Sequence, residues 1–206
     1  MADATMLMRF RISLLRVEPT IWRVIDVPAD YSFWDLHVAI QDAMGWHDEH
    51  LHVFALGEDG KRARERLGLS MPDAGDGIRP DHEVKVADRL SDPGDTVIYI
   101  YDFGDYWRHA VELIDTHAVG STLDLPRCVD GERACPPEDC GGDPGYEELL
   151  EVLADPRHEA HADMVAWLKR HPGGHWPFDP EAFEPGGVVF RDPAAHLASV
   201  LQDLNR

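Results

Sequence analysis

The chain has 206 residues, and its 39 Asp and Glu outnumber its 19 Lys and Arg, which gives a formal net charge of −20 at pH 7. Because DNA and anionic membranes are negatively charged, such a chain contacts them only through a local basic patch or a partner. The hydrophobic fraction of 44% is that of an ordinary globular protein, and the length suits one core, or one domain with a small appendage.

A β-hairpin is predicted at the start of the chain. Residues 8–14 alternate between apolar and polar side chains, as a half-buried strand does. After a turn at Glu18 and Pro19, residues 21–27 are rich in β-branched and aromatic side chains and predict the returning strand.

A helix is predicted to begin at Ser32, which can form a capping box with Asp35 three residues later. Apolar residues recur at helical spacing as far as Met44, and Gly45 suits the position that follows a helix C-terminus. Residues 51–56 then predict a third strand.

Two more strands are predicted after a long interruption. Residues 57–81 are polar and rich in Gly, which predicts a long mobile loop. Residues 96–101 form a continuous apolar run typical of a strand buried on both faces, and residues 107–114 predict a further strand. On this last strand His109 shares one face with apolar neighbours.

From about residue 120 the pattern changes to loop and helix signals. A segment rich in Cys, Pro and Gly runs to Gly145. Asp-Pro pairs punctuate the remainder, and each can open a helix because Asp is a good N-cap and Pro a good first helical residue. The pairs are Asp143-Pro144, Asp155-Pro156, Asp179-Pro180 and Asp192-Pro193. Apolar stripes beginning at Tyr146, Ala160 and Leu197 predict three helices.

The order of hairpin, helix, strand, long loop, two strands and helices predicts an α+β fold with a mixed β-sheet and a C-terminal helical region. A β-grasp sheet has the same order of hairpin, helix and strands. We expect a sheet domain over residues 1–119, with the Cys-rich loop and helices of residues 120–206 packed on it as one structural unit.

No segment predicts membrane insertion or export. No apolar run approaches the roughly 18 residues of a membrane span, and the N-terminus lacks the basic and apolar regions of a signal peptide. Three cysteines, an odd number, argue against a disulfide framework. We therefore expect a cytoplasmic protein without a membrane partner.

Four segments combine aromatic, acidic, His and Cys residues in specific strings. They are Ile21-Trp22-Arg23; Met44-Gly45-Trp46 followed by His50-Leu51-His52-Val53-Phe54; Tyr101-Asp102-Phe103-Gly104-Asp105-Tyr106-Trp107-Arg108-His109; and Cys135-Pro136-Pro137-Glu138-Asp139-Cys140-Gly141-Gly142 with Gly145-Tyr146. Together, over roughly residues 7–184, these strings make the chain resemble the plasmid pRiA4b ORF-3-like family. The resemblance implies a plasmid or mobile-element context, since some members are TnpR-type passenger proteins of insertion elements.

The resemblance implies no particular reaction, and the residues do not support the recombinase that the TnpR label names. A serine recombinase needs an activated Ser among Arg residues and a basic DNA-binding element. None of the six serines lies in such a motif, and the chain is acidic. The sequence therefore leaves open whether the protein is an enzyme.

Cys128, Cys135 and Cys140 form a candidate zinc site. Thiolates are good Zn²⁺ ligands, and His109 would complete a Cys₃His set. The alternative is that the thiols are reduced and partly buried, or that two form a labile disulfide, without a metal. Cys140 is also a candidate nucleophile, because a helix beginning near residue 144 would lower the pKa of its thiol.

Asp102, Asp105 and His109 form a second candidate site, with His50 and His52 as weaker candidates for the same cation. Carboxylates and imidazoles can hold a divalent cation or act as general acids and bases. On the predicted strand, His50 and His52 point to the same side. The alternative is structural, since Asp-Phe-Gly-Asp is good turn chemistry and His109 suits a core position with one hydrogen bond.

The best local patch for nucleic acid consists of Lys61, Arg62, Arg64 and Arg66. Duplex DNA would have to bind through these side chains, against the field of the acidic remainder.

These features favour a non-enzymatic interaction module that serves a protein partner in a plasmid or mobile-element context. Motif aromatics found exposed together would mark the partner surface. They are Trp22, Trp46, Tyr106, Trp107, Tyr146 and Trp176.

Two alternatives stay open. One is a metal-dependent or thiol enzyme whose site lies between the Asp-Phe-Gly-Asp turn and the Cys loop, at Asp102, Asp105, His109 and Cys140. The other is a nucleic-acid-associated protein that uses the basic patch at residues 61–66.

Overall fold

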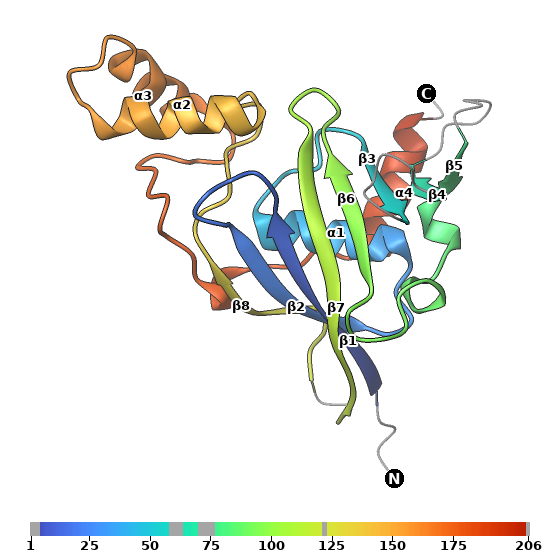
Figure 1. The fold of residues 1–206 in the computed structure, drawn as a ribbon. Helices are drawn as coiled ribbons and strands as arrows, with labels where there is room; N and C mark the ends of the chain where they lie inside the picture. The colour runs from blue at the N-terminus through green and yellow to red at the C-terminus, as the bar shows by residue number, and fades with distance from the viewer. Residues whose placement is uncertain (1–4, 58–63, 70–76, 121–122, 205–206) are drawn as a thin grey trace.

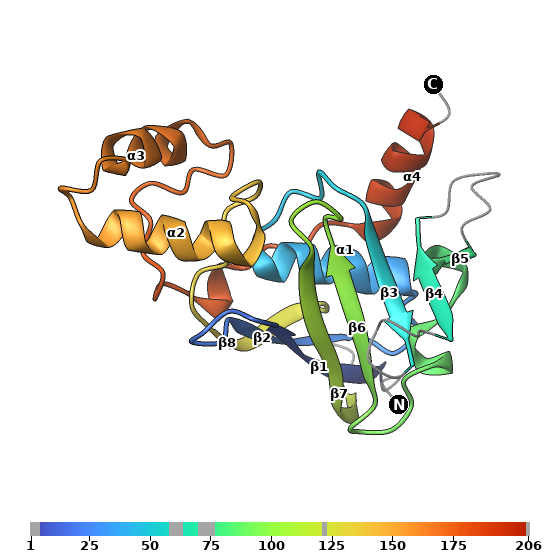
Figure 2. The ribbon, with the colours of Figure 1, turned by 45° about the horizontal axis from the view of Figure 1, so that its top comes forward.

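The computed structural model describes residues 5–57, 64–69, 77–120 and 123–204. One eight-stranded sheet dominates it, with the strand order β5-β4-β3-β6-β7-β1-β2-β8. A helix, α1, lies against one face of the sheet (Figure 1). Helices α2 and α3 lie beyond the β8 end, and α4 lies towards the β5 end (Figure 2). The predicted α+β class with a mixed sheet is therefore confirmed.

The predicted hairpin is present as β1 (Thr5–Leu14) and β2 (Trp22–Pro28). The two strands pair antiparallel from Leu7 opposite Pro28 to Ser13 opposite Trp22. Alternate residues of β1 are buried, as the period of two predicts.

The predicted helix is α1 (Phe33–Met44), and its ends are those that the sequence indicates. Ser32 accepts a hydrogen bond from the Asp35 backbone N–H, while the Asp35 carboxylate accepts from the Ser32 N–H, so the capping box is complete. Gly45 ends the helix with a φ of 92°, a left-handed conformation that a Cβ would disfavour.

The centre of the sheet is formed by β3 (His52–Leu56), β6 (Thr96–Tyr101) and β7 (Trp107–Val119). β7 pairs antiparallel with β6 on one side and with β1 on the other. Both neighbours of β1 thus run antiparallel to it. The chain therefore shares with a β-grasp fold the order of hairpin, helix and strands. Phe33 of α1 packs edge-on against Phe54 of β3 at 5.0 Å between ring centroids, within one continuous apolar core.

The described part of residues 57–81 corrects the prediction of a loop. It contains β4 (Glu65–Gly68), antiparallel to β3, and β5 (Ile78–Pro80), parallel to β4. Leu67 is fully buried and anchors β4. Short 3₁₀ helices in the described residues lie at Asp81–Glu83, Val86–Asp88 and Pro185–Gly187.

The C-terminal region adds a strand and three helices. β8 (Arg127–Glu132) pairs with β2 at the sheet edge, within the segment expected to be a loop. The three predicted helices are α2 (Gly142–Ala154), α3 (His161–Arg170) and α4 (Pro193–Leu204). None of the described helices is long and apolar enough to cross a membrane.

The Asp-Pro pairs mark these helices less regularly than expected. Asp192 accepts hydrogen bonds from the first backbone N–H groups of α4, as an N-cap does. Asp143-Pro144 lies inside the first turn of α2, because Gly141 takes the N-cap position. Asp155-Pro156 follows α2, and Asp179-Pro180 opens no helix.

Helix α4 is held against α1 by polar contacts. Arg191 pairs with Asp42 at 2.5 Å, and the Trp34 indole donates a hydrogen bond to the Pro193 carbonyl at 2.9 Å. The segment after residue 120 contacts the sheet through β8 and contacts α1 through α4. The division into a sheet domain that ends at residue 119 and a second region that begins at residue 120 stays a prediction.

Candidate functional site

Three motif segments that are far apart in the chain meet at one end of β3 and β6. They are the residues before β3, the DFGD turn (residues 102–105) between β6 and β7, and the Cys loop (residues 133–141) before α2. The Nε2 atom of His50 lies 2.9 Å from Asp139, 3.7 Å from Asp102 and 3.7 Å from Glu138. We call His50, Asp102, Glu138 and Asp139 the junction.

Asp102 closes the turn, as one of the two interpretations of the sequence predicted, and it also lies among candidate ligand atoms. Its Oδ1 accepts a hydrogen bond from the Gly104 N–H at 2.8 Å, which closes the turn. Its Oδ2 faces His50, and one candidate ligand atom from each of His50, Asp102 and Asp139 lies within 4.8 Å of the others. This half-exposed group of one imidazole and two carboxylates can hold a divalent cation.

Glu138 is the buried member of the junction. Its Oε1 accepts hydrogen bonds from the His47 N–H at 2.8 Å and from the Tyr101 hydroxyl at 3.0 Å. Burial raises the pKa of Glu138, although these hydrogen bonds oppose the rise.

Asp105 joins the DFGD turn to helix α2. Its carboxylate accepts a hydrogen bond from the Gly141 N–H at 3.0 Å. A Cβ added to Gly142 would lie 2.5 Å from the Asp105 carbonyl oxygen, so the two backbones touch here. Asp105 therefore fixes the geometry of the junction without joining its group of candidate ligands.

His109 does not reach the junction, which corrects its placement among the catalytic and metal candidates. Its ring is fully buried, 5.3 Å from the Trp46 ring and 5.4 Å from the Tyr99 ring. Neither ring nitrogen has a hydrogen-bond partner among the described residues. Burial lowers its pKa to about 3, so it is a neutral core histidine.

The three cysteines are free thiols in separate settings. Cys128 lies on β8, Cys135 is buried, and Cys140 is partly buried next to α2. None of them belongs to a group of three candidate ligands in the described residues, so the Cys₃His109 set is not brought together.

Cys140 is not an activated thiol, which corrects the expected effect of α2. Burial raises its pKa to about 12, and the nearby carboxylate of Asp105 adds to the rise. Burial also raises the pKa of Cys128 and of Cys135. Desolvation and negative neighbours thus outweigh a short helix terminus.

His50 and His52 point to different places, against the prediction from strand alternation. β3 begins only at His52, and the preceding segment bends at Asp48, whose φ is 62°. His50 therefore belongs to the junction, whereas His52 points into the interior, 2.7 Å from Asp81.

Sequence reasoning missed Glu138 and Asp139, although they lie within a quoted motif. The acidic pair between Cys135 and Cys140 is the signal in the sequence that could have identified these two residues.

Half of the basic patch lies outside the described residues, namely Lys61 and Arg62. Arg64 and Arg66 are exposed. Between them, Glu65 pairs with Arg79 and Arg89.

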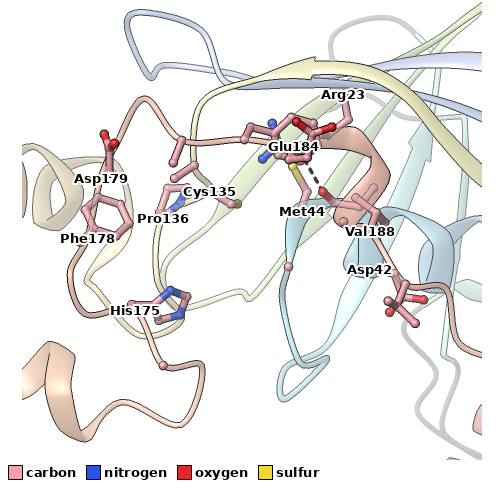
Figure 3. Close-up of a pocket in the computed structure, with 18 of the residues that line it drawn as sticks. Arg23, Asp42, Met44, Cys135, Pro136, His175, Phe178, Asp179, Glu184 and Val188 are labelled. Atoms are coloured by element: carbon pink, nitrogen blue, oxygen red, sulfur yellow. Dashed lines mark hydrogen bonds between the residues drawn. The ribbon is translucent and has the colours of Figure 1, made fainter.

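A separate cavity of about 440 Å³ lies between the end of α1, the Cys loop and residues 174–189 (Figure 3). Arg23 reaches into its wall, but its guanidinium donates hydrogen bonds to the carbonyls of Trp22, Ala43, Glu132 and Arg133. The Phe183 ring covers it at 3.6 Å. Arg23 therefore braces the fold and has little capacity to bind a ligand.

The fold and the junction define an α+β protein whose single large sheet is covered by a helix on one face and carries its motif residues at one strand end. The family model described as "Plasmid pRiA4b ORF-3-like protein" matches residues 6–186. The chain belongs to this family, as its motifs predicted.

Two similar proteins agree with this assignment. Uncharacterized protein y4hQ of Sinorhizobium fredii (strain NBRC 101917 / NGR234) is 37% identical over 163 residues, which cover 77% of this chain and 79% of that protein. The crystal structure of the protein of unknown function MM3350 from Methanosarcina mazei Go1 has a TM-score of 0.78 and 37% identity, over 91% of this chain and 100% of that one.

Proposed function

We propose that the protein is a non-enzymatic interaction module that binds a protein partner through an apolar tip beside the junction. The apolar tip consists of Leu51, Phe103 and Tyr106, which are 50%, 49% and 45% exposed. The Asp102 N–H donates a hydrogen bond to the Leu51 carbonyl at 3.0 Å, so the two segments are adjacent. The exposure of these side chains at one strand end is the observation that carries the proposal.

Next to the tip, the open face of the sheet is hollowed. A cavity of about 420 Å³ is lined by Phe103, Tyr106 and residues of β3 to β6: Val53, Ala55, Arg66, Ile78 and Ile100. Val53 and Ala55 alternate with Phe54, which faces α1, so they point to the opposite face. An apolar segment of a partner can lie in this groove and against the tip.

Arg66 defines the chemistry of the partner further. It is exposed at the groove and has no ion pair in the described part of the chain. In a protein with a net charge of −20, an unpaired cation beside an apolar groove selects an apolar segment that also carries a carboxylate.

The other motif aromatics support this location. Trp46, Trp107 and Tyr146 are buried in the core, and Trp22 is partly buried. Tyr106 and Trp176 are both exposed, and of these two Tyr106 lines the groove together with Phe103. We place the partnership in the cytoplasm, which the three free thiols favour, and in a plasmid or mobile-element context, which the family's name suggests.

Peptide display on the immobilised protein tests this proposal. We expect enriched peptides with apolar residues beside an Asp or Glu, whose binding to the double variant Phe103→Ser/Tyr106→Ser is at least about tenfold weaker, because buried aromatic anchors dominate binding energy. The control is Trp176→Ser, an exposed Trp elsewhere on the surface. A selection without enrichment, or peptides that bind all three proteins equally, would contradict the proposal.

A second candidate function is metal-dependent chemistry at the junction. The observation that favours it is the single imidazole of His50 among three carboxylates at 2.9–3.7 Å. Asp102 would be a ligand, and Glu138, whose pKa is raised by burial, would be the group that transfers a proton.

Calorimetric titration with Mn²⁺ and Zn²⁺ tests the junction. His50→Gln should weaken binding by about tenfold or more, because it removes the one nitrogen ligand. His117→Gln is the matched control, since His117 also contacts a carboxylate, that of Asp115, at 2.9 Å on the surface. Equal affinities in these two variants would exclude the junction as the site.

A further inference from the structure

We propose that the protein binds a divalent transition-metal ion at a second, buried site between α1, β3 and α4, held by His37, Asp48 and His52. We call these residues, together with Asp81 and His196, the buried cluster. It is separate from the junction, and it does not depend on the proposed interaction function.

The candidate ligand atoms of the buried cluster are already close together. One atom from each of His37, Asp48 and His52 lies within 4.8 Å of the others. The His37 and His52 rings stack at 3.5 Å between centroids with an angle of 7°. Because a metal ion lies in the plane of each imidazole that binds it, one of the two rings has to turn when the ion binds. Asp48 bridges the group, with one oxygen 3.0 Å from His37 Nε2 and the other 2.7 Å from His196 Nε2.

The charges of the buried cluster are unusual for this molecule. Asp81 is fully buried and Asp48 nearly so, and in the described part of the chain their ion-pair partners are all histidines. By contrast, the buried Asp26 pairs with Arg9 and Arg127. Two carboxylates that are removed from water are stabilised by a nearby positive charge, and a divalent metal ion among these histidines would supply it.

The protonation states suit metal binding. Burial and the neighbouring His52 lower the pKa of His37 to about 4, so this imidazole is neutral at pH 7. Burial alone would raise the pKa of Asp48, but the adjacent histidines outweigh it and lower the value to about 2. Neutral imidazoles and ionised carboxylates are the states that bind metals.

One nitrogen of His37 is left for a ligand. Its Nε2 atom is buried and, although Asp48 is 3.0 Å away, it makes no hydrogen bond of acceptable geometry. This nitrogen lies among carboxylate and imidazole atoms. When it is unprotonated, its lone pair can bind a metal ion placed among them.

Surrounding side chains orient these ligands, as the outer shell of a metal site does. His37 Nδ1 lies 2.8 Å from the Tyr99 hydroxyl, which accepts a hydrogen bond from Gln41. His52 Nε2 contacts Asp81, whose other oxygen accepts from the His82 N–H. The Trp34 ring stacks on His196 at 5.6 Å and closes the cluster on the α4 side.

The donor set selects the kind of metal. Imidazoles combined with carboxylates suit Zn²⁺, Co²⁺ and Ni²⁺ better than Ca²⁺ or Mg²⁺, which prefer oxygen alone. His196 is the most exposed residue of the buried cluster, with 21% of its side chain accessible. It lies beyond residue 186, where the family match ends. The three central ligands lie within the match.

The experiment titrates the full chain, stripped of metal by a chelator, with Zn²⁺ and with Co²⁺, whose visible absorption reports nitrogen and oxygen ligands. All proteins carry His50→Gln, which removes the junction. We expect one ion per chain in this background, at least tenfold weaker binding after Asp48→Asn or His196→Gln, and no change after His117→Gln.

Each outcome decides the proposal. Absence of stoichiometric metal in the His50→Gln background would overturn it, as would unchanged affinity in a folded Asp48→Asn protein. If Asp48→Asn does not fold, His196→Gln decides, because His196 lies on α4 with 21% of its side chain accessible. If the wild-type protein binds the ion and the His50→Gln protein does not, the ion belongs to the junction.

Discussion

Burial determines the chemistry of the titratable side chains more strongly than their sequence motifs do. His109 and Cys140 lie within shared strings, yet desolvation leaves the first neutral and the second protonated. His50 and His52 are two positions apart, and a bend before β3 sends them to different clusters. A sequence shows which residue types are present, but not whether water reaches them.

The buried His109 predicts a pH dependence of stability. Because its pKa is about 3 in the folded protein and about 6.5 in the unfolded chain, only the unfolded chain takes up its proton between these values. The contribution of neutral His109 to the free energy of unfolding is complete above pH 6.5. It falls by about 1.4 kcal/mol per pH unit as the pH drops below that value.

Urea unfolding from pH 4.5 to pH 7 measures this effect. The free energy of unfolding of the wild-type protein should fall more steeply with decreasing pH than that of His109→Leu. The difference in slope should correspond to the uptake of close to one additional proton on unfolding. His117→Gln, at an exposed site, should leave the slope unchanged. Parallel pH profiles for the wild type and His109→Leu would contradict the assignment of His109 to the dry core.

At the scale of elements, local signals were sufficient for the hairpin, α1 and the three C-terminal helices. The capping box at Ser32 and the left-handed Gly45 depend on neighbours within four residues. β4 and β8 were missed because they lack an apolar alternation and exist through pairing with β3 and β2. The partner of β8 is far away in the sequence, so this pairing leaves no local signal.

The contact between α2 and the DFGD turn predicts a sensitivity at Gly142. Gly142→Ala should destabilise the protein by about 2–4 kcal/mol, because it combines a left-handed φ of 69° with a Cβ 2.5 Å from the Asp105 carbonyl oxygen. Thermal or urea unfolding measures the loss.

Gly94→Ala separates the two causes. Gly94 also has a positive φ, of 101°, but an added Cβ meets nothing within 4 Å. This variant should lose about 1–2 kcal/mol, the cost of backbone conformation alone. If both variants lose the same free energy, the close approach between α2 and the turn is not part of the native structure.

On the scale of the whole molecule, the sheet separates a covered face from an open one. α1 lies on the first face (Figure 1) and forms the core with it. The second face carries the groove that leads to the apolar tip. The junction joins residues 50, 102 and 139, whose proximity follows only from the complete sheet and the return of the Cys loop. The sequence predicted the class and the motifs, whereas this convergence required the fold.

In the folded molecule, part of the acidic surplus that gives the net charge of −20 lies in specific contacts. Some acidic side chains are buried and paired with arginine, as Asp26 is, and others gather with histidine at the junction and in the buried cluster. Arg66 stands beside the apolar groove as a cation without an ion pair in the described residues. One exposed arginine therefore lies beside an apolar groove in a protein that is acidic as a whole.

The central claim is that this surface binds a partner protein, and the affinity of the tightest displayed peptide tests it most directly. Fluorescence anisotropy would compare the wild-type protein, Phe103→Ser/Tyr106→Ser and Trp176→Ser. The account predicts that the double variant binds at least about tenfold more weakly, while the control binds as the wild type does. Equal affinity for the wild-type protein and the folded double variant would contradict it.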